Sequence, residues 1–236
     1  MSDSEDAVIY AKKHHKLLVA EICNIGKHEA STKPFTLFMA GSPGSGKTEY
    51  SKSLLKELEK MDPSQKIVRL DTDELRELLP QYSGNNSDVV QKAATLLFDK
   101  AFDHIQNKHL NAIIDTTFAS PRSIGNVDRA INRDRKVGIL YLHQDPLVAW
   151  EYTKKRERLE GRTVPKDVFI RAYFYAKDNV DKIKTKYGDQ IELNLFEKDH
   201  KNNFVKKARF NINSLDEFIK ENYTHDALEK VLSNSI

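Results

Sequence analysis

The chain has 236 residues, of which 39% are hydrophobic and 31% charged, a composition that suits one folded soluble domain better than two. Its formal net charge of +3, without a segment dense in lysine and arginine, argues against a nucleic-acid partner. The single cysteine, Cys23, excludes an internal disulfide framework, and no segment reaches the ~20 apolar residues that span a bilayer, so we expect a cytoplasmic protein without a membrane partner.

The spacing of apolar residues predicts helices that alternate with short strands. A helix is expected over 5–27, so that residues 1–33 form an N-terminal helix and linker and residues 34–236 form the main domain. The expected strands are 34–40, 67–71, 110–115, 137–142 and 191–197, with a sixth candidate at 204–212. Helices are expected after residues 48 and 87, at 146–160 and 165–183, and in the tail from Ser214. This alternation indicates an α/β fold, with a parallel sheet of about five strands flanked by helices.

A phosphate-binding motif follows the first predicted strand. Residues 41–48 read GSPGSGKT and fit the pattern G-x-x-x-x-G-K-[ST], which makes the fold a P-loop NTPase type. The glycines let backbone amides face phosphate oxygens, Lys47 reaches the β- and γ-phosphates, and Thr48 offers a hydroxyl to Mg²⁺. A plain turn between strand and helix is the alternative. We therefore predict a site for ATP and Mg²⁺ formed by Gly41, Ser42, Pro43, Gly44, Ser45, Gly46, Lys47 and Thr48.

Acidic residues stand where two predicted strands end. The second strand ends at Asp71, and Asp73 begins the next helix, so both are candidates for helix capping. A kinase also needs one carboxylate that orients the acceptor hydroxyl and takes its proton, and we choose Asp73 for that base. Asp115 follows the third strand, where it could hold Mg²⁺ through a water, contact substrate hydroxyls or cap the next segment.

Arginines gather near a glycine between the helices expected at 146–160 and 165–183. Residues 154–165 read KKRERLEGRTVP, and most of these charges suit a solvated helix end. Arg162, between Gly161 and Pro165, stands where a mobile connection could close over phosphates and neutralise charge in the transition state. Arg156 is the preferred helper on the preceding helix, and Arg158 the lesser choice.

Together these residues resemble the zeta toxin family of P-loop kinases over roughly residues 35–185. The resemblance lies in GSPGSGKT at 41–48, LDTDELR at 70–76 followed by Leu79 and Pro80, IIDTT at 113–117, and GRTVP at 161–165. The P-loop is common to many families. The combination of D-x-D-x-x-R-x-x-x-P with a later G-R-x-x-P is much more specific.

The resemblance implies an ATP-dependent kinase that phosphorylates UDP-N-acetylglucosamine on the sugar. It places the family's catalytic aspartate on Asp73, the phosphate-loop lysine on Lys47, and the lid arginines on Arg162 and Arg156. The family often carries glutamate where this chain has Asp115. Toxin members are usually neutralised by an antitoxin that blocks the ATP site, so an antitoxin protein is a candidate partner beside the small-molecule acceptor. The candidate contacts with the acceptor are Asp73, Arg76, Asp115, Thr117 and Arg122.

Two other functions stay open on the sequence. A P-loop kinase that acts on a polynucleotide 5′-hydroxyl, a nicotinamide dinucleotide or an antibiotic would use the same catalytic residues. A nucleotide-dependent switch without transfer activity would leave Asp73 idle. The N-terminal helix could lie over the nucleotide site as a built-in inhibitor or pack on the sheet, and we prefer packing.

Overall fold

The computed structural model describes residues 2–23, 30–64, 66–161, 163–199, 204–220 and 222–234. A six-stranded sheet in the order β2-β3-β1-β4-β5-β6 forms its centre, and all neighbouring pairs are parallel except β5 with β6. The sequence therefore predicts the α/β class and the parallel sheet correctly. The strands are β1 (Phe35–Ala40), β2 (Ile67–Asp71), β3 (Asn111–Asp115), β4 (Lys136–His143), β5 (Ile191–Lys198) and β6 (Val205–Arg209).

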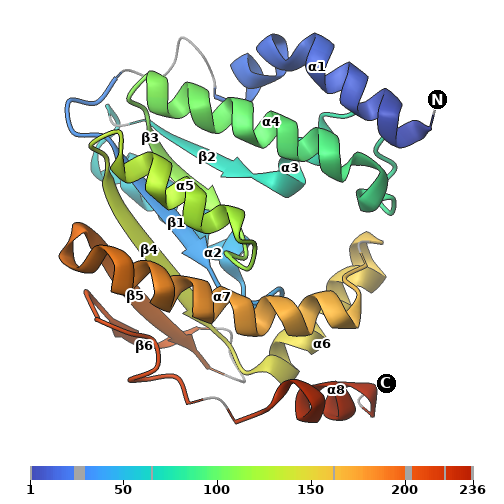
Figure 1. The fold of residues 1–236 in the computed structure, drawn as a ribbon, viewed down its shortest axis with the longest axis vertical. Helices are drawn as coiled ribbons and strands as arrows, with labels where there is room; N and C mark the ends of the chain where they lie inside the picture. The colour runs from blue at the N-terminus through green and yellow to red at the C-terminus, as the bar shows by residue number, and fades with distance from the viewer. Residues whose placement is uncertain are drawn as a thin grey trace.

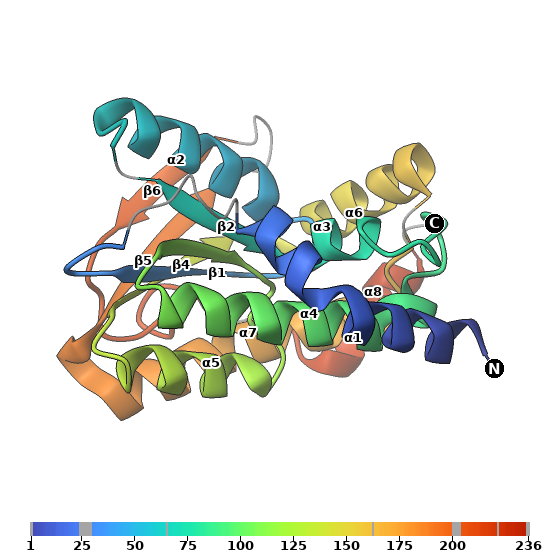
Figure 2. The ribbon, with the colours of Figure 1, turned by 90° about the horizontal axis from the view of Figure 1, so that it is seen from above.

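Helices cover both faces of this sheet (Figures 1 and 2). Apolar side chains of α2 pack on one face, while α4, α5 and α7 cover the other. A separate apolar cluster joins α6, α7 and α8 beside the sheet. The helices are α1 (Asp3–Ile22), α2 (Lys47–Met61), α3 (Thr72–Glu77), α4 (Ser87–Asn107), α5 (Arg122–Ile131), α6 (Pro146–Glu160), α7 (Lys166–Tyr187) and α8 (His225–Ser233), with a short 3-10 helix at Gly188–Gln190.

The register of the inner strands brings their carboxyl ends to one edge of the sheet. Every residue of β3 is buried, as expected for a parallel strand covered on both faces. Asp71 at the end of β2 stands beside Asp115 at the end of β3, and Asp115 stands beside Met39 near the end of β1. The phosphate loop follows β1 directly, so the acidic strand ends and this loop meet at the same edge.

Helix α1 lies along α4, on the outer side of the sheet's helical layer (Figure 1). Ser2 and Glu5 form a capping box at its start, and Ala7 and Ala11 are fully buried. Small alanine side chains let the two helices approach closely. The described part of α1 ends at Ile22 rather than at residue 27, and residues 24–29 lie outside the described ranges. The helix therefore packs mainly on α4 rather than on the sheet itself, where the sequence prediction placed it.

Three elements differ from the sequence prediction. The sixth strand is present but short and antiparallel, and its charged residues suit an exposed sheet edge. Among its described residues, the tail is helical only in α8, because Asp181 of α7 accepts hydrogen bonds from Ser214 Oγ and the Leu215 amide and holds a loop there. Helix α5 was not predicted, although Ile124, Val127 and Ile131 recur at helical spacing in its ten residues, which also contain Gly125.

Candidate active site

The phosphate loop connects β1 to α2 and depends on glycine at two close contacts. Gly44 has a φ of 74°, and a Cβ there would lie 2.0 Å from the Ala149 carbonyl oxygen of α6. Gly46 has a φ of 85° and begins α2 without a side-chain cap within the described chain, so the first amides of α2 are available to an anion. The loop therefore has the backbone that a phosphate cradle needs.

Lys47 lies at the centre of this loop. Its Nζ donates hydrogen bonds to the carbonyl oxygens of Gly41 (2.9 Å) and Ser42 (2.7 Å), and the residue is only 7% exposed. Burial lowers the pKa of Lys47 from 10.5 to about 8, although nearby carboxylates, chiefly Asp115 and Asp71, oppose this shift. The ammonium group is therefore held in a poorly solvated position where phosphate charges would stabilise it.

Asp71 acts as a helix cap. Its Oδ1 accepts a hydrogen bond from the Asp73 amide at 2.9 Å, which satisfies the first turn of α3. Its Oδ2 lies 2.6 Å from Arg69 Nη2. Burial raises the pKa of Asp71 to about 6, and the charges of Asp115 and Asp73 add to this shift while the Asp73 amide and Arg69 oppose it. The capping alternative for this residue agrees with the geometry.

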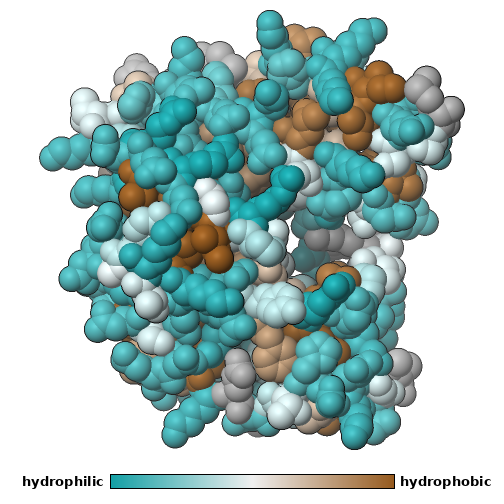
Figure 3. Space-filling model, viewed as in Figure 1, coloured by the Kyte–Doolittle hydropathy of each residue, from teal (hydrophilic) through white to brown (hydrophobic). Residues whose placement is uncertain are grey.

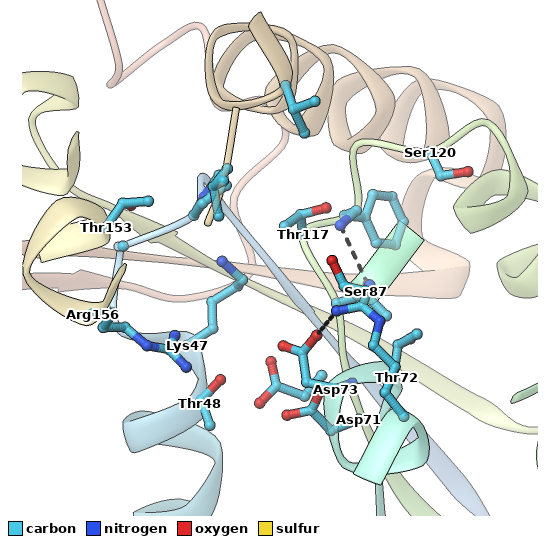
Figure 4. Close-up of a pocket in the computed structure, with 18 of the residues that line it drawn as sticks. Lys47, Thr48, Asp71, Thr72, Asp73, Ser87, Thr117, Ser120, Thr153 and Arg156 are labelled. Carbon is cyan, nitrogen blue, oxygen red and sulfur yellow. Dashed lines mark hydrogen bonds and ion pairs between the residues drawn. The ribbon is translucent and has the colours of Figure 1, made fainter. Parts of the chain in front are cut away.

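Asp73 occupies the first turn of α3 and lines the cleft above the phosphate loop (Figure 4). Its side chain is 31% exposed, and its Oδ1 lies 2.6 Å from Arg76 Nη1. Arg76 also donates to Gln91 Oε1 on α4 at 2.5 Å. The arginine thus ties the carboxylate of Asp73 to the neighbouring helix, and both predicted residues belong to one wall of the cleft.

Asp115, Thr117 and Arg122 also line this cleft, with different partners. Asp115 Oδ2 accepts hydrogen bonds from Ser51 Oγ at 2.7 Å and from Arg69 Nη2 at 2.6 Å. The carbonyl oxygen of Thr117 accepts from the Gly41 amide at 3.2 Å and fixes the end of β3 to the phosphate loop. Arg122, at the start of α5, is 64% exposed and pairs with Asp99 of α4 at 3.2 Å.

The opposite wall is formed by α6, by the connection to α7 and by the start of α7. Arg156 extends from α6 and lines the cleft, whereas Arg158 is not among the lining residues of the described chain (Figure 4). Arg162 lies outside the described residues, so its predicted place in the lid remains a prediction. Between the walls lies an open cleft of about 770 Å³, visible as the hollow between the α3 and α6 sides in Figure 3.

The sequence did not indicate how α4 contributes to this cleft. Four of its polar residues recur at intervals of three or four positions and lie on the cleft side of the helix. From the sequence alone, such a stripe is indistinguishable from the solvent-exposed face of an ordinary surface helix, because the elements that form the opposite wall are distant in the chain. The residues are Asp88, Gln91, Thr95 and Asp99.

Two other kinds of site are absent from the described residues. No cluster of three or more histidine, cysteine, aspartate or glutamate side chains within the described ranges is arranged to hold a metal ion. Among the same residues, none of the helices combines the length and apolar character that crossing a bilayer requires.

Comparison with known proteins identifies one matching family. The family model described as zeta toxin matches residues 19–209. No curated protein matches the chain. A solved structure of the PezAT chromosomal toxin–antitoxin system of Streptococcus pneumoniae has a TM-score of 0.63 at 14% identity, over 92% of this chain and 86% of that one.

Two further solved structures share the fold at lower similarity. AvrRxo1-ORF1 in complex with AvrRxo1-ORF2 and ATP has a TM-score of 0.55 at 14% identity, over 84% of this chain and 63% of that one. The Pnkp1/Rnl/Hen1 RNA repair complex has a TM-score of 0.50 at 18% identity, over 67% of this chain and 48% of that one. At these identities the structural matches describe the fold alone.

Proposed function

The chain belongs to the zeta toxin family, and from that premise we propose that it transfers the γ-phosphate of ATP to a hydroxyl group of a nucleotide sugar, with UDP-N-acetylglucosamine as the expected acceptor. One observation carries the proposal: the phosphate loop with Lys47, the carboxylate of Asp73 and the guanidinium of Arg156 line a single cleft from three different elements. A carboxylate facing a phosphate cradle is the arrangement that phosphoryl transfer to an alcohol requires.

Each residue has a distinct task in this proposal. Backbone amides of the phosphate loop and Lys47 hold the β- and γ-phosphates, and Asp73 orients the acceptor hydroxyl and takes its proton as the bond to phosphorus forms. Arg156, with Arg162 as the second candidate, neutralises charge that develops on the transferred group. Arg76 keeps Asp73 in place through their 2.6 Å ion pair.

The residues near the loop fit a magnesium ion. Thr48 offers a hydroxyl at the first turn of α2, and the Asp115 carboxylate is held beside it by Ser51 and Arg69. Mg²⁺ usually keeps several waters and needs only one or two protein oxygens beside the substrate phosphates, which suits a site without a cluster of acidic ligands among the described residues. When bound, the ion would neutralise phosphate charge during transfer.

The α4 wall supports a sugar as the acceptor. Gln91, Thr95 and the carboxylates of Asp88 and Asp99 face the cleft with hydrogen-bonding groups, and hydroxyl-rich ligands need many such partners. Phe98, on the same helix, adds an apolar surface. Arg122 forms an exposed ion pair with Asp99, which contributes little and can be exchanged for a ligand phosphate.

Product analysis with a panel of acceptors tests this proposal. The protein would be incubated with ATP, Mg²⁺ and UDP-N-acetylglucosamine, other uridine-diphosphate sugars, or an oligonucleotide with a 5′-hydroxyl, and the products identified by mass spectrometry. We expect a phosphorylated nucleotide sugar. If no uridine-diphosphate sugar is phosphorylated, UDP-N-acetylglucosamine is rejected as the acceptor. If only the oligonucleotide is phosphorylated, the protein is a polynucleotide 5′-hydroxyl kinase.

The variant Asp73→Asn separates a kinase from a switch. We expect turnover to fall by about 10²–10⁴-fold while ATP binding is retained, because only proton transfer is lost. Glu77→Gln on the exposed side of α3 is the matched control and should leave turnover unchanged. Equal turnover of the Asp73 variant and wild type would remove the base from the mechanism.

We also propose an antitoxin as a protein partner. The family membership and the toxin–antitoxin assembly of the similar PezAT structure support it. Co-expression with a candidate antitoxin followed by affinity purification would test this. A partner that does not reduce ATP binding would contradict the expectation that it blocks the nucleotide site.

A further inference from the structure

We propose that Arg69, which lies outside the cleft, is a positioning residue that fixes the first turn of α3, and with it the backbone of Asp73, relative to the phosphate loop; this inference rests on the proposed kinase function. Arg69 belongs to β2 and its side chain is only 6% exposed. It does not line the cleft that holds Lys47 and Asp73. Any effect on phosphate transfer must therefore pass through the residues that it contacts.

The guanidinium of Arg69 contacts four side chains at once. Nη2 lies 2.6 Å from Asp71 Oδ2 and 2.6 Å from Asp115 Oδ2, and Nη1 lies 2.6 Å from Glu74 Oε1. Nε donates to Ser51 Oγ at 2.8 Å. Every nitrogen of the group has a partner, and the planar fork of arginine is suited to such simultaneous contacts.

These contacts lead to the helix that carries Asp73 and to the helix that follows the phosphate loop. On one side, Asp71 accepts from Arg69 with one oxygen and from the Asp73 amide with the other, at 2.9 Å, so it links the guanidinium to the first turn of α3. On the other side, Ser51 stands one turn after Lys47 in α2 and donates to Asp115 at 2.7 Å. Arg69 thus connects the helix that begins at the phosphate loop with the helix that carries Asp73.

The position of Arg69 also has an electrostatic reason. Asp71 and Asp115 are paired in register on adjacent strands, where neighbouring strands lie about 4.8 Å apart. Both carboxylates are almost completely buried, so they would repel each other across a poorly solvated gap without a cation between them. Loss of the guanidinium would push the strand ends apart and shift α3 with Asp73.

Lysine cannot replace arginine here. An ammonium group carries the same charge, but it is a compact point charge that cannot span Ser51, Asp71, Asp115 and Glu74 in the fixed geometry of a guanidinium. The variant Arg69→Lys therefore keeps the charge and removes the geometry. Lys52→Met is a matched control, because Lys52 also connects α2 to Glu74 of α3, at 3.2 Å, but does so on the exposed surface.

Amide hydrogen exchange on the protein without nucleotide is the first measurement. In Arg69→Lys we expect the amide of Asp73, which is bonded to Asp71, and the amide of Ser51 in the second turn of α2 to exchange at least ~10-fold faster, while amides of β4 and β5 keep their protection. The second measurement is steady-state kinetics, in which kcat should fall ~10–100-fold with the KM for ATP within about threefold. Lys52→Met should change neither.

Two results would overturn the proposal. If neither the amide exchange in α2 and α3 nor kcat changes, Arg69 does not position any group that phosphate transfer requires. A uniform loss of protection across the sheet, with activity falling only in proportion to the melting temperature, would show that Arg69 stabilises the whole fold and has no specific effect on Asp73. If Arg69→Lys does not fold, the charge-balanced pair Arg69→Met with Asp71→Asn provides the same test, since asparagine still caps α3.

Failure of the proposed function gives a different pattern. Without phosphate transfer by the wild type, only the kinetic measurement would be lost. The exchange rates would still report whether Arg69 fixes α3 against α2. The two ideas can therefore fail separately.

Discussion

Raising the pH from 7 to 9 should weaken ATP binding through Lys47. In the protein without nucleotide the pKa of Lys47 is about 8, because burial of the ammonium outweighs the attraction of the nearby carboxylates. Phosphate oxygens of ATP would add negative charge beside this group and raise its pKa in the complex. The complex therefore holds more protons than the free protein above pH 8, and affinity must fall as protons are removed.

The size of the effect follows from that pKa. Lys47 is about nine-tenths protonated at pH 7 and about one-tenth protonated at pH 9, so the dissociation constant should rise about tenfold, or ~1.4 kcal/mol. Burial raises the pKa of Cys23 to about 12, which keeps that thiol silent in this range. The secondary ionisation of a phosphate group lies near pH 6, so ATP itself contributes little between pH 7 and 9.

Isothermal titration with a non-hydrolysable ATP analogue would measure this. Titrations at pH 7, 8 and 9 in two buffers of different ionisation enthalpy give both the dissociation constant and the number of protons taken up. We expect uptake of about 0.1 proton at pH 7 and about 0.9 at pH 9. A dissociation constant that changes less than about twofold, with no proton uptake at pH 9, would refute the assigned environment of Lys47.

Three further predictions concern the loop, the opposite wall and the N-terminal helix. Folding lowers the Lys47 pKa from 10.5 to about 8, which corresponds to about 3 kcal/mol of destabilisation at pH 7. The stability of the wild-type protein should therefore rise as the pH increases from about 8 to 10.5, where the unfolded chain binds more protons than the folded one. Lys47→Met should therefore abolish ATP binding. It should also raise the free energy of unfolding at pH 7 by about 1–2 kcal/mol in urea titrations, which is the destabilisation relieved less the hydrogen bonds lost to the loop carbonyls. Arg156→Met should lower kcat about 10–100-fold with little change in the dissociation constant of ATP, whereas Arg158→Met should not. Removal of residues 1–23 should lower the melting temperature without raising kcat, because α1 buries Ala7, Ala11 and Leu18 in the main core; a more active truncated protein would support the inhibitor alternative.

The sequence predicted the parallel strands well because each is a short apolar run between turn residues. Strand β2 has the predicted bounds, and β3, β4 and β5 differ by one residue at one or both ends. The strand order could not be read, since it depends on contacts between residues far apart in the chain. Helix α5 was missed although Ile124, Val127 and Ile131 recur at helical spacing, because the element is only ten residues long and contains Gly125, an unfavourable residue in a helix interior.

Residue types at the candidate site were predictable, but their partners were not. The P-loop pattern is local, so the glycines and Lys47 could be recognised from spacing alone. The contact of Arg69 with Asp115 joins residues 46 positions apart and exists only because β2 and β3 pair in register. The cleft side of α4 likewise becomes distinct from its solvated sides only when α6 stands opposite.

The choice between the two aspartates of the D-x-D sequence illustrates how the fold divides one motif into two tasks. Asp71 ends a strand, so its side chain is enclosed, and both of its oxygens are engaged by Arg69 and the Asp73 amide. A group whose oxygens already hold the backbone of α3 cannot approach an acceptor without unravelling that turn. Both aspartates line the cleft, but Asp73 stands on the first turn of α3 with a side chain that is 31% exposed, against 6% for Asp71. We therefore infer that the first aspartate sets the geometry in which the second one acts, which is why Asp71→Ala, which removes the cap that asparagine would keep, should disturb the position of Asp73 before it changes any proton transfer.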